Sequence, residues 1–574
     1  MYRTFAFILG LFGVSTILLP AQTLADLEQQ ASASRKPSIS LSGNVGASAE
    51  LFSSTRASTR DPFIGRGFTN LSLGLGGFRT GLNLLYSTEN QNFRQSINRL
   101  GLEGGWSWLQ LGAGDTYPQF SEFGLNGVML RGGYGLFQPS GLRLGFAAGT
   151  TQTAINAQAQ PDITVDGFSS DGQFRRDLYA GTIGFQDRVF KLYFTGVSAK
   201  DDTLSIQKSG NARPMSNLSL GGVLGLDLKH FLADVEATAS AINHDLRATA
   251  LDQEEVLNSV ELSLTDGLDP VLDWLWDRFS PTAGAAASYA IRARSAIRTR
   301  PFTVLGQYRY VAPGFQSLGL YTIRDDVQNW SVQPTLNLAG GHLTLNGQYA
   351  AERNNLSEQR ASTLERTIMS GNLRFQAGGF FSFSGQFQQT QTTSLPADQN
   401  MADVQHQTIQ NISLNPTISF STQKTHRHQL QLTAARQRFA NEEAGNRTQF
   451  DNRNASAFWN SQLPRQISLQ MQVGYLDNTS ALGTNQTWMA QGGGQKMLNG
   501  RKTRLDFQVG FNQTEQSFSN TPAEVFRQWN SRLALNQRWG SKTQVYVQVQ
   551  GTLNESTQLR YREIRSRIQM TRQF

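Results

Sequence analysis

The 574-residue sequence contains no cysteine, and Asp, Glu, Lys and Arg together make up only 16% of it. The absence of Cys excludes disulfide scaffolds, thiolate metal sites and Cys nucleophiles. Soluble domains carry about a quarter of charged residues, so this chain is poor in charge. The pI near 9.6 comes from a net charge of only +8 spread over a long chain, which argues against a basic nucleic-acid surface.

Long apolar runs are also scarce, since the only one lies at the start of the chain. Arg3 is followed by an apolar stretch from Phe5 to Leu19, and Ala25 precedes Asp26 as a small residue does at a signal-peptidase site. The stretch is shorter than the ~18 residues that a membrane helix needs. We therefore predict a cleaved secretory signal peptide over residues 1–25 and a short periplasmic segment over 26–37. The mean hydropathy of −0.38 excludes a bundle of membrane helices.

Uncharged polar residues alternate with apolar ones along most of the chain from residue 38 onward. Ile467, Leu469 and Met471 alternate with Gln466, Ser468 and Gln470, and the stretches 504–512 and 544–550 repeat the pattern. Successive side chains of a strand point to opposite faces, so each stretch predicts one apolar and one polar, largely uncharged face. We count about 26 such segments of ~10–14 residues, the length of a tilted membrane-spanning strand. Soluble strands are usually half as long.

The connections between these segments alternate between short and long. Asn499-Gly500 is the strongest short turn, because both central residues of a type I′ turn need positive φ. The other short turns are predicted at 76–77, 104–105, 139–140, 187–188, 229–230, 300–301, 340–341, 378–379, 423–424, 463–464 and 540–541. The long connections are predicted at 53–67, 153–172, 200–214, 243–284, 313–326 and 396–403. Short periplasmic turns and long external loops are typical of bacterial outer-membrane barrels, and an even strand count places both ends of the barrel on the periplasmic side. A large secreted β-protein such as an adhesin is the alternative.

The C-terminal segment Ile564–Phe574 ends in an aromatic residue. Phe574, Met570, Ile568 and Ile564 share one face, although Arg572 and Ser566 fall on the same face. This ending resembles the C-terminal strand of bacterial outer-membrane β-barrel proteins, where the last aromatic residue is recognised by the barrel-assembly machinery. The resemblance implies the same assembly route here.

Together these features predict an all-β fold over residues 38–574, a transmembrane antiparallel up-and-down β-barrel of about 26 strands (range 22–26). Five of the nine Trp residues lie at segment ends, where aromatic residues meet the two membrane interfaces. Trp330, Trp488 and Trp529 follow long connections, and Trp459 and Trp539 lie beside short turns.

One insertion within residues 243–285 abandons the alternation. The stretch Asp252–Phe279 carries an apolar stripe at helical spacing and predicts two short helices. Barrels of about 22 strands already contain a plug, so a barrel this wide needs its lumen narrowed or kept open for large cargo. The insertion predicts either a lid that pairs with lumenal arginines or a solvated external helical loop. The acidic residues that would line this lid or lumen include Asp252, Glu254, Glu255, Glu261, Asp273 and Asp277.

Two stretches rich in Gly, Pro and Asp have a different character from the other connections. They are residues 112–118 with 125–132, and residues 310–319 with Asp325-Asp326. Their composition fits ordered loops that turn sharply. Two interpretations remain open, a constriction that bends into the lumen and an ordinary external turn.

The sequence does not predict an enzyme, a cofactor or a metal site. His426 and His428 lie in a predicted periplasmic turn where both could reach one metal ion, but two ligands alone do not make a metal site. The chain lacks a G-x-S-x-G elbow and an H-E-x-x-H motif. Basic strand positions suit either a polyanionic cargo or Arg–carboxylate networks within the barrel. They include Arg175, Arg176, Arg292, Arg294, Arg504, Arg560, Arg562 and Arg565.

We therefore predict a wide channel in the cell outer membrane for diffusion or export of a polar solute or polymer. The alternative is a surface-binding or structural barrel whose loops bind a partner or polysaccharide, or a component of a secretion complex. The expected partners are outer-membrane lipids, lipopolysaccharide and the barrel-assembly machinery, with a secreted polymer or protein as potential cargo and no nucleic acid.

Overall fold

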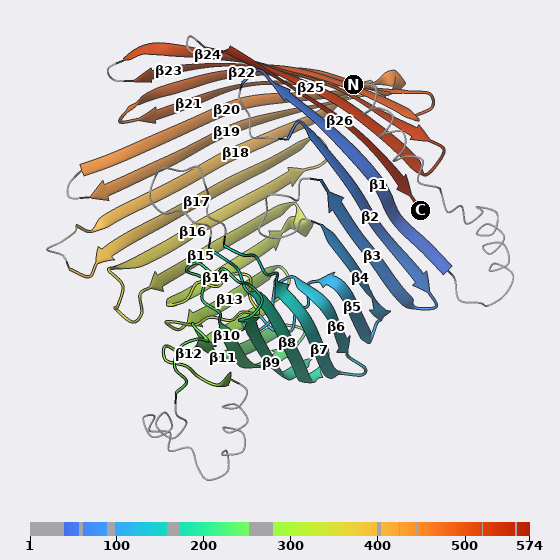
Figure 1. Cartoon of the computed structure of the whole chain (residues 1–574). Coiled ribbons are helices and arrows are strands. Elements are labelled where there is room, and N and C mark those ends of the chain that lie inside the picture. Colours follow the sequence, from blue (N-terminus) through green and yellow to red (C-terminus); the bar gives the residue numbers. More distant parts are fainter. Residues whose placement is uncertain are drawn as a thin grey trace.

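The computed structural model describes residues 39–56, 61–88, 98–157, 171–251, 279–398, 403–423, 425–443, 446–518, 521–556 and 560–574. These residues form a single sheet of 26 strands with two short 3₁₀ turns, η2 (Ala339–Gly341) and η3 (Pro464–Gln466) (Figure 1). The strands are β1 (Ile39–Ser54), β2 (Phe63–Leu75), β3 (Phe78–Ser87), β4 (Arg99–Trp106), β5 (Leu109–Thr116), β6 (Leu130–Phe137), β7 (Leu142–Gln152), β8 (Arg175–Gln186), β9 (Phe190–Asp202), β10 (Ser216–Asp227), β11 (Phe231–Asn243), β12 (Ala286–Arg298), β13 (Phe302–Val311), β14 (Val327–Leu338), β15 (Leu343–Asn354), β16 (Ser362–Ala377), β17 (Phe381–Pro396), β18 (Gln405–Gln423), β19 (His426–Glu443), β20 (Asn446–Leu463), β21 (Ile467–Ser480), β22 (Gly483–Leu498), β23 (Thr503–Phe518), β24 (Thr521–Trp539), β25 (Thr543–Glu555) and β26 (Arg560–Gln573).

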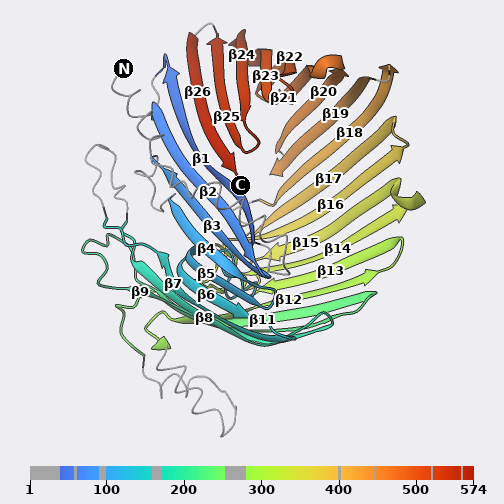
Figure 2. The same ribbon diagram turned by 90° about the vertical axis from the view of Figure 1, so that its right-hand side faces the viewer.

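The sheet is closed into a barrel. Each strand pairs antiparallel with the next one, and β26 returns to pair with β1, from Asn44 opposite Gln573 to Ser54 opposite Glu563. Figure 2 shows these two strands side by side. Closure gives every strand a partner on both sides and leaves no strand at an edge of the sheet. The predicted closed antiparallel barrel is confirmed, with the strand number at the upper end of the predicted range.

Residues alternate between the outer surface and the lumen along every strand. On β11, Val235 is 45% exposed on the outer surface, whereas Asp234 and Glu236 on the opposite face are 4% and 2% exposed. No helix in the described part of the chain is long and apolar enough to cross a bilayer.

Two aromatic rings bound the apolar band of the outer surface. On β24, Trp529 and Trp539 are both exposed on this surface, with Leu533 and Leu535 between them. Ten residues of strand span about 33 Å, and a tilt of about 40° reduces this to the roughly 25 Å of an outer-membrane apolar band. The upper ring, next to the long loops, contains Tyr289 with Tyr310, Trp330 with Tyr349, Tyr475 with Trp488, and Phe511 with Trp529. The lower ring contains Phe78, Trp106, Trp108 and Phe137, then Phe185 with Phe190, Phe375 with Phe381, and Phe420 with His428 and Trp459. Trp330, Trp459 and Trp539 lie near strand ends as predicted. Trp488 and Trp529 lie within β22 and β24, because these strands continue beyond the upper ring.

The short turns that fall on described residues lie where the sequence predicts them, with one exception. Residue 424 of the turn predicted at 423–424 lies outside the described residues. Asn499 and Gly500 have the expected positive φ values of 50° and 63°. The turn predicted at Gly104-Gly105 is wrong, because these glycines lie within β4 and the chain reverses at 107–108. A Cβ atom on Gly105 would lie 1.8 Å from the carbonyl oxygen of Leu109. This glycine therefore permits a close approach of β5 rather than forming a turn.

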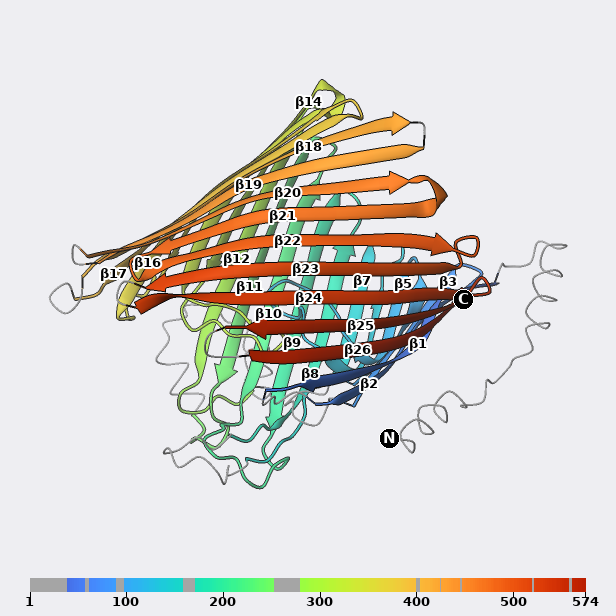
Figure 3. The same ribbon diagram turned by 90° about the horizontal axis from the view of Figure 1, so that it is seen from above.

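The barrel has two unlike walls. The N-terminal wall, β4–β15, has strands of 8–13 residues, whereas the C-terminal wall, β16–β26, has strands of 13–19 residues. Figure 3 shows the long strands from above. Beyond the upper aromatic ring their outer face becomes polar, with Arg436 and Arg453 both bonded to Asp451 at 2.7 and 3.0 Å. The long strands thus extend beyond the apolar band.

Three predicted segments lie outside the described residues. They are the signal peptide at 1–25, the periplasmic segment at 26–37 and most of the helical insertion, residues 252–278. The neck of the insertion is described. Asn243, which is fully buried, donates hydrogen bonds to the carbonyl oxygens of Phe279 and Ser280, and Ala250 pairs with Thr282.

Candidate functional site

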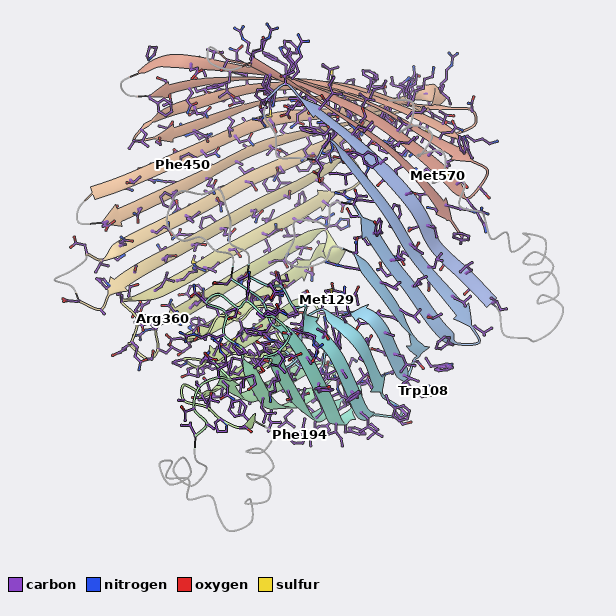
Figure 4. All side chains as sticks on the ribbon, viewed as in Figure 1. Trp108, Met129, Phe194, Arg360, Phe450 and Met570 are labelled. Carbon is purple, nitrogen blue, oxygen red and sulfur yellow. The ribbon has the colours of Figure 1, made fainter. Side chains whose placement is uncertain are left out.

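Two connections of the N-terminal wall fold into the barrel. The first inward loop is the β5–β6 connection, residues 117–129, and the second is the β13–β14 connection, residues 312–326. Three apolar side chains of these loops, Phe123, Leu125 and Phe315, are fully buried. Side chains of a loop that extends into solvent would be exposed. The contacts of the three buried side chains, described below, are with lumen-facing strand residues. Figure 4 labels Met129 at the end of the first loop and Phe194 on the outer surface of β9. Of the two interpretations left open by the sequence, the structure shows the inward one.

An apolar core forms between the first inward loop and the lumenal face of the wall. Phe120 and Leu125 of the loop pack with Leu178, Val197 and neighbouring small residues of β8 and β9. These strand residues alternate with outward Tyr179 and Phe194, so β8 and β9 carry apolar side chains on both faces. Inward apolar side chains such as Leu178 and Val197 would be unfavourable on a lumenal face that contacted only water.

The second inward loop shares a smaller core with the first. The rings of Phe123 and Phe315 meet edge to face, with centroids 6.1 Å apart. Ala290, Val311 and Val327 from β12, β13 and β14 complete this cluster. The two loops therefore stabilise each other as well as contacting the wall.

Backbone groups bind the two loops to each other and to β10 and β11. Ser317 Oγ donates to the carbonyl oxygen of Gly124 at 3.0 Å, and the Asn126 N–H donates to the carbonyl of Gly319 at 3.0 Å. Asn217 on β10 accepts from the Leu318 N–H at 3.1 Å and donates to the carbonyl of Gln316. These bonds hold the loop backbone against the strands.

A cluster of charges with a buried centre, formed by Arg292, Asp234 and Glu236, anchors the first inward loop. Arg292 on β12 contacts Glu122 of the loop, Asp234 at 3.1 Å and Glu236 at 3.2 Å. Glu236 also accepts the Phe123 N–H at 3.1 Å. Arg294 makes a bidentate pair with Asp234, and Arg309 approaches Glu122 at 3.9 Å. Three arginines and three carboxylates therefore balance, which removes the cost of an uncompensated buried charge.

Asp325 and Asp326 fix the far end of the second inward loop. Asp326 is 2% exposed, accepts the Leu356 N–H at 2.7 Å and pairs with Arg360 at 2.9 Å. Asp325 pairs with Arg360 at 3.1 Å and accepts the Gly314 N–H. Figure 4 labels Arg360 on the connection beyond β15. The two carboxylates act here as loop anchors.

Three grooves with amide side chains in their lining lie on the lumenal face of the C-terminal wall. The largest, of about 560 Å³, crosses β20–β25, and the others have volumes of about 400 Å³ and 300 Å³. Asn and Gln side chains line all three. Amide side chains of this wall face the interior, together with a few charged residues such as Arg504 and Asp506. On the opposite wall the two inward loops cover the lumenal face.

The structure brings some of the site residues predicted from sequence together and leaves others undescribed. Ile564, Ile568 and Phe574 are exposed on the outer face of the last strand, with Met570 between them in the register. The guanidinium of Arg572 lies 5.5 Å from the Phe574 ring centroid. Recognition of this face by assembly machinery stays a prediction. The acidic residues of the insertion, Asp252, Glu254, Glu255, Glu261, Asp273 and Asp277, lie outside the described residues.

Most of the strand arginines flagged in the sequence belong to Arg–carboxylate pairs, which is the second of the two interpretations given for them. The pairs include Arg175 with Asp202, Arg176 with Asp201, Arg292 and Arg294 with Asp234, Arg504 with Asp506, Arg560 with Glu555, and Arg565 with Glu50. Sequence reasoning missed Glu122, Asp234 and Glu236. The sequence alone does not show that these carboxylates are buried, because their burial depends on the position of the first inward loop.

The described residues contain no group of three or more His, Asp or Glu side chains arranged to hold a metal ion. His428 stacks between Phe420 and Trp459 in the lower aromatic ring and hydrogen-bonds to Ser461 at 2.9 Å. The His428 side chain therefore packs with the lower aromatic ring on the outer surface of the barrel.

Comparisons with known proteins identify no family for the whole chain. Residues 408–573, corresponding to most of β18–β26, match the model of a protein family of unknown function, DUF481. No curated protein matches the chain.

Solved structures that the chain resembles are outer-membrane β-barrels. They include the P pilus usher (PapC) translocation pore, at 10% identity and a TM-score of 0.35 over 93% of this chain and 99% of that chain. Another is the E. coli P pilus tip assembly intermediate PapC-PapD-PapK-PapG, at 11% and 0.40 over 93% and 61%. A third is Acinetobacter baumannii OccAB3, at 10% and 0.29 over 63% and 92%. These similarities are low, and the strand pairing itself establishes the barrel.

Proposed function

We propose that this protein is a channel of the cell outer membrane whose lumen is narrowed from one side. The observation that carries the proposal is the difference between the two lumenal faces. The first and second inward loops cover the N-terminal wall, whereas the C-terminal wall keeps a polar, grooved face. A channel for polar cargo needs a lumen that offers hydrogen bonds without strong charge, and Gln, Asn, Ser and Thr supply them.

The membrane location is supported by the apolar band between the two aromatic rings, which has the height of an outer-membrane barrel. Assembly is proposed to use the outward face of Ile564, Ile568, Met570 and Phe574, and a signal peptide at 1–25 would direct the chain to the periplasm. Outer-membrane lipids and lipopolysaccharide are the proposed surroundings. The insertion Asp252–Phe279 is proposed as a lid over the lumen, and deleting it should raise the single-channel conductance.

Planar-bilayer recording of the purified mature protein tests the channel. We expect stable, repeated conductance steps of one size. Resistance of the strands to protease in lipid vesicles would show separately that the barrel inserts. A barrel that inserts by this measure but gives no conductance steps would contradict the proposal.

A surface-binding barrel is the second candidate, favoured by one observation. The strands of the C-terminal wall extend beyond the upper aromatic ring and present charged outer residues such as Arg436, Asp451 and Arg453. Binding of the inserted protein to a cell-surface polymer without any conductance would favour this candidate.

A further inference from the structure

The largest groove, of about 560 Å³, is built from lumen-facing residues of six consecutive strands of the C-terminal wall. It includes Asn and Gln side chains from β20, β21, β22, β23 and β24, and Phe458 and Tyr546 add two aromatic rings. The amide residues are Asn460, Gln462, Gln470, Gln495, Gln508 and Asn536.

These six amides are available for a ligand. Within the part of the chain that the structure describes, none of their side chains makes a hydrogen bond to another protein group. The charged residues of the groove are instead occupied. Arg504 Nε donates to both carboxylate oxygens of Asp506, at 2.8 and 3.0 Å, and Arg532 donates to the Tyr546 hydroxyl at 2.9 Å. The groove therefore offers six neutral amides beside one cation, Arg532, whose only partner among the described residues is the uncharged Tyr546 hydroxyl.

A second groove on the same wall repeats this chemistry. Its volume is about 300 Å³, and it is lined by amides of β17–β20. The amide residues are Gln386, Gln388, Asn411, Gln437, Asn452 and Asn454. The side-chain oxygen of Asn454 is buried without a hydrogen-bond partner among the described residues. Two amide-lined grooves on one lumenal face suit a ligand whose polar groups recur along its length.

We propose that these grooves bind an uncharged linear glycan that passes through the lumen, a proposal that rests on the proposed channel function. Each amide has two donors and an acceptor, and each sugar hydroxyl both donates and accepts, so the pairing is complementary without charge. Phe458 and Tyr546 can cover the apolar face of a sugar ring. A polyanion would need a row of unpaired cations, and this groove has only Arg532, because Arg504 is paired with Asp506.

Single-channel recording with maltohexaose as the probe tests the proposal. We expect transient blockades, and a double variant, Gln470→Leu with Gln508→Leu, should shorten the blockade time about tenfold, because two net hydrogen bonds are lost. Because Leu and Gln have similar volumes, we expect the barrel of the double variant still to form a pore, which its conductance steps in buffer alone would show. The matched control is Asn346→Leu with Gln348→Leu on the lumenal face of β15, outside both grooves, and its blockade time should equal that of the unmodified protein.

Three further probes set the limits of the proposal. A polyethylene glycol of the same hydrodynamic size, a Gly-Ser peptide and an oligouronate should each give blockades that the Gln470 and Gln508 substitutions do not shorten. If the two substitutions shortened the blockade time of the peptide as much as that of maltohexaose, the proposal of an uncharged glycan would be refuted. Blockades by the oligouronate alone would refute it as well.

Calorimetric titration of maltohexaose into the detergent-solubilised barrel separates the two proposals. Binding that the double variant weakens, in a protein that never conducts, would support the glycan site and refute the channel. Normal conductance without any binding or blockade would refute the glycan site alone.

Discussion

The two walls of the barrel obey the same alternation of faces but use the lumenal face in opposite ways. On the N-terminal wall, short strands carry long connections, and Leu178 and Val197 face inward to be covered by the first inward loop. On the C-terminal wall, long strands are joined by shorter connections, and the same inward positions are amides such as Gln470 and Gln508. The residue type at inward positions therefore distinguishes a lumenal face that is covered by protein from one that is left to water.

The electrostatics of the two walls differ in the same way. The Arg292 side chain is 10% exposed beneath the first inward loop, whereas Arg436 on β19 is 50% exposed above the apolar band. A buried pair must remain complete, because a lone buried charge is costly, while an exposed pair contributes little. This contrast yields quantitative tests.

The largest effect is expected from Phe315→Ala. Phe315 is fully buried against Phe123, and truncation of a buried Phe costs about 3–5 kcal/mol in the free energy of unfolding. Phe458→Ala, on the half-buried lumenal face of the opposite wall, is the control and should cost less than about 1 kcal/mol. Urea unfolding of the detergent-solubilised barrel measures both changes. If the two variants lost the same free energy of unfolding, the proposed difference between the walls would be wrong.

A smaller effect, about 3 kcal/mol, is expected from Arg292→Leu, because Asp234 and Glu236 would remain buried with one cation fewer. Arg436→Leu should change the free energy of unfolding by about 0–1 kcal/mol, because its partner Asp451 keeps Arg453. Adding Asp234→Asn and Glu236→Gln to Arg292→Leu should recover part of the loss. The absence of any recovery would show that Arg292 acts through packing rather than charge.

The smallest effect concerns the turns of the lower rim and their response to pH. The N–H groups of Phe190 and Val189 donate to the Asp187 carboxylate and hold its pKa below the usual range. Because the folded pKa is lowered, this contribution is complete above the unfolded value of about 4 and is lost as the pH falls through the folded pKa.

The turn at Asn499-Gly500 has no such carboxylate and relies on positive φ. Below pH 4, hydrogen exchange corrected for intrinsic rates should speed up at the Val189 and Phe190 amides but not at Lys502, whose N–H donates to the Asn499 carbonyl. Equal acceleration at both turns would show that Asp187 does not set the difference.

The barrel could be predicted from the sequence because its signals are local. The alternation from Ile467 defines β21, Asn499-Gly500 defines a turn, and Ile564 with Ile568 defines the outward face of β26. The site could not be predicted in the same way. Glu236 meets Phe123 across 113 residues of chain, and only the register of the intervening strands brings them together. Leu178 and Val197 on inward positions were the available signal that something apolar covers this wall.

The central claim is that the inward loops narrow an otherwise open lumen, and the single-channel conductance after removal of the first inward loop tests it most directly. Residues 119–127 would be replaced by a short Gly-Ser linker, with replacement of 204–211, in the largely exposed β9–β10 connection, as the control. We predict that the conductance rises severalfold for the first variant and stays unchanged for the second. A conductance that is the same in both variants and in the unmodified protein would show that the loop does not limit the channel.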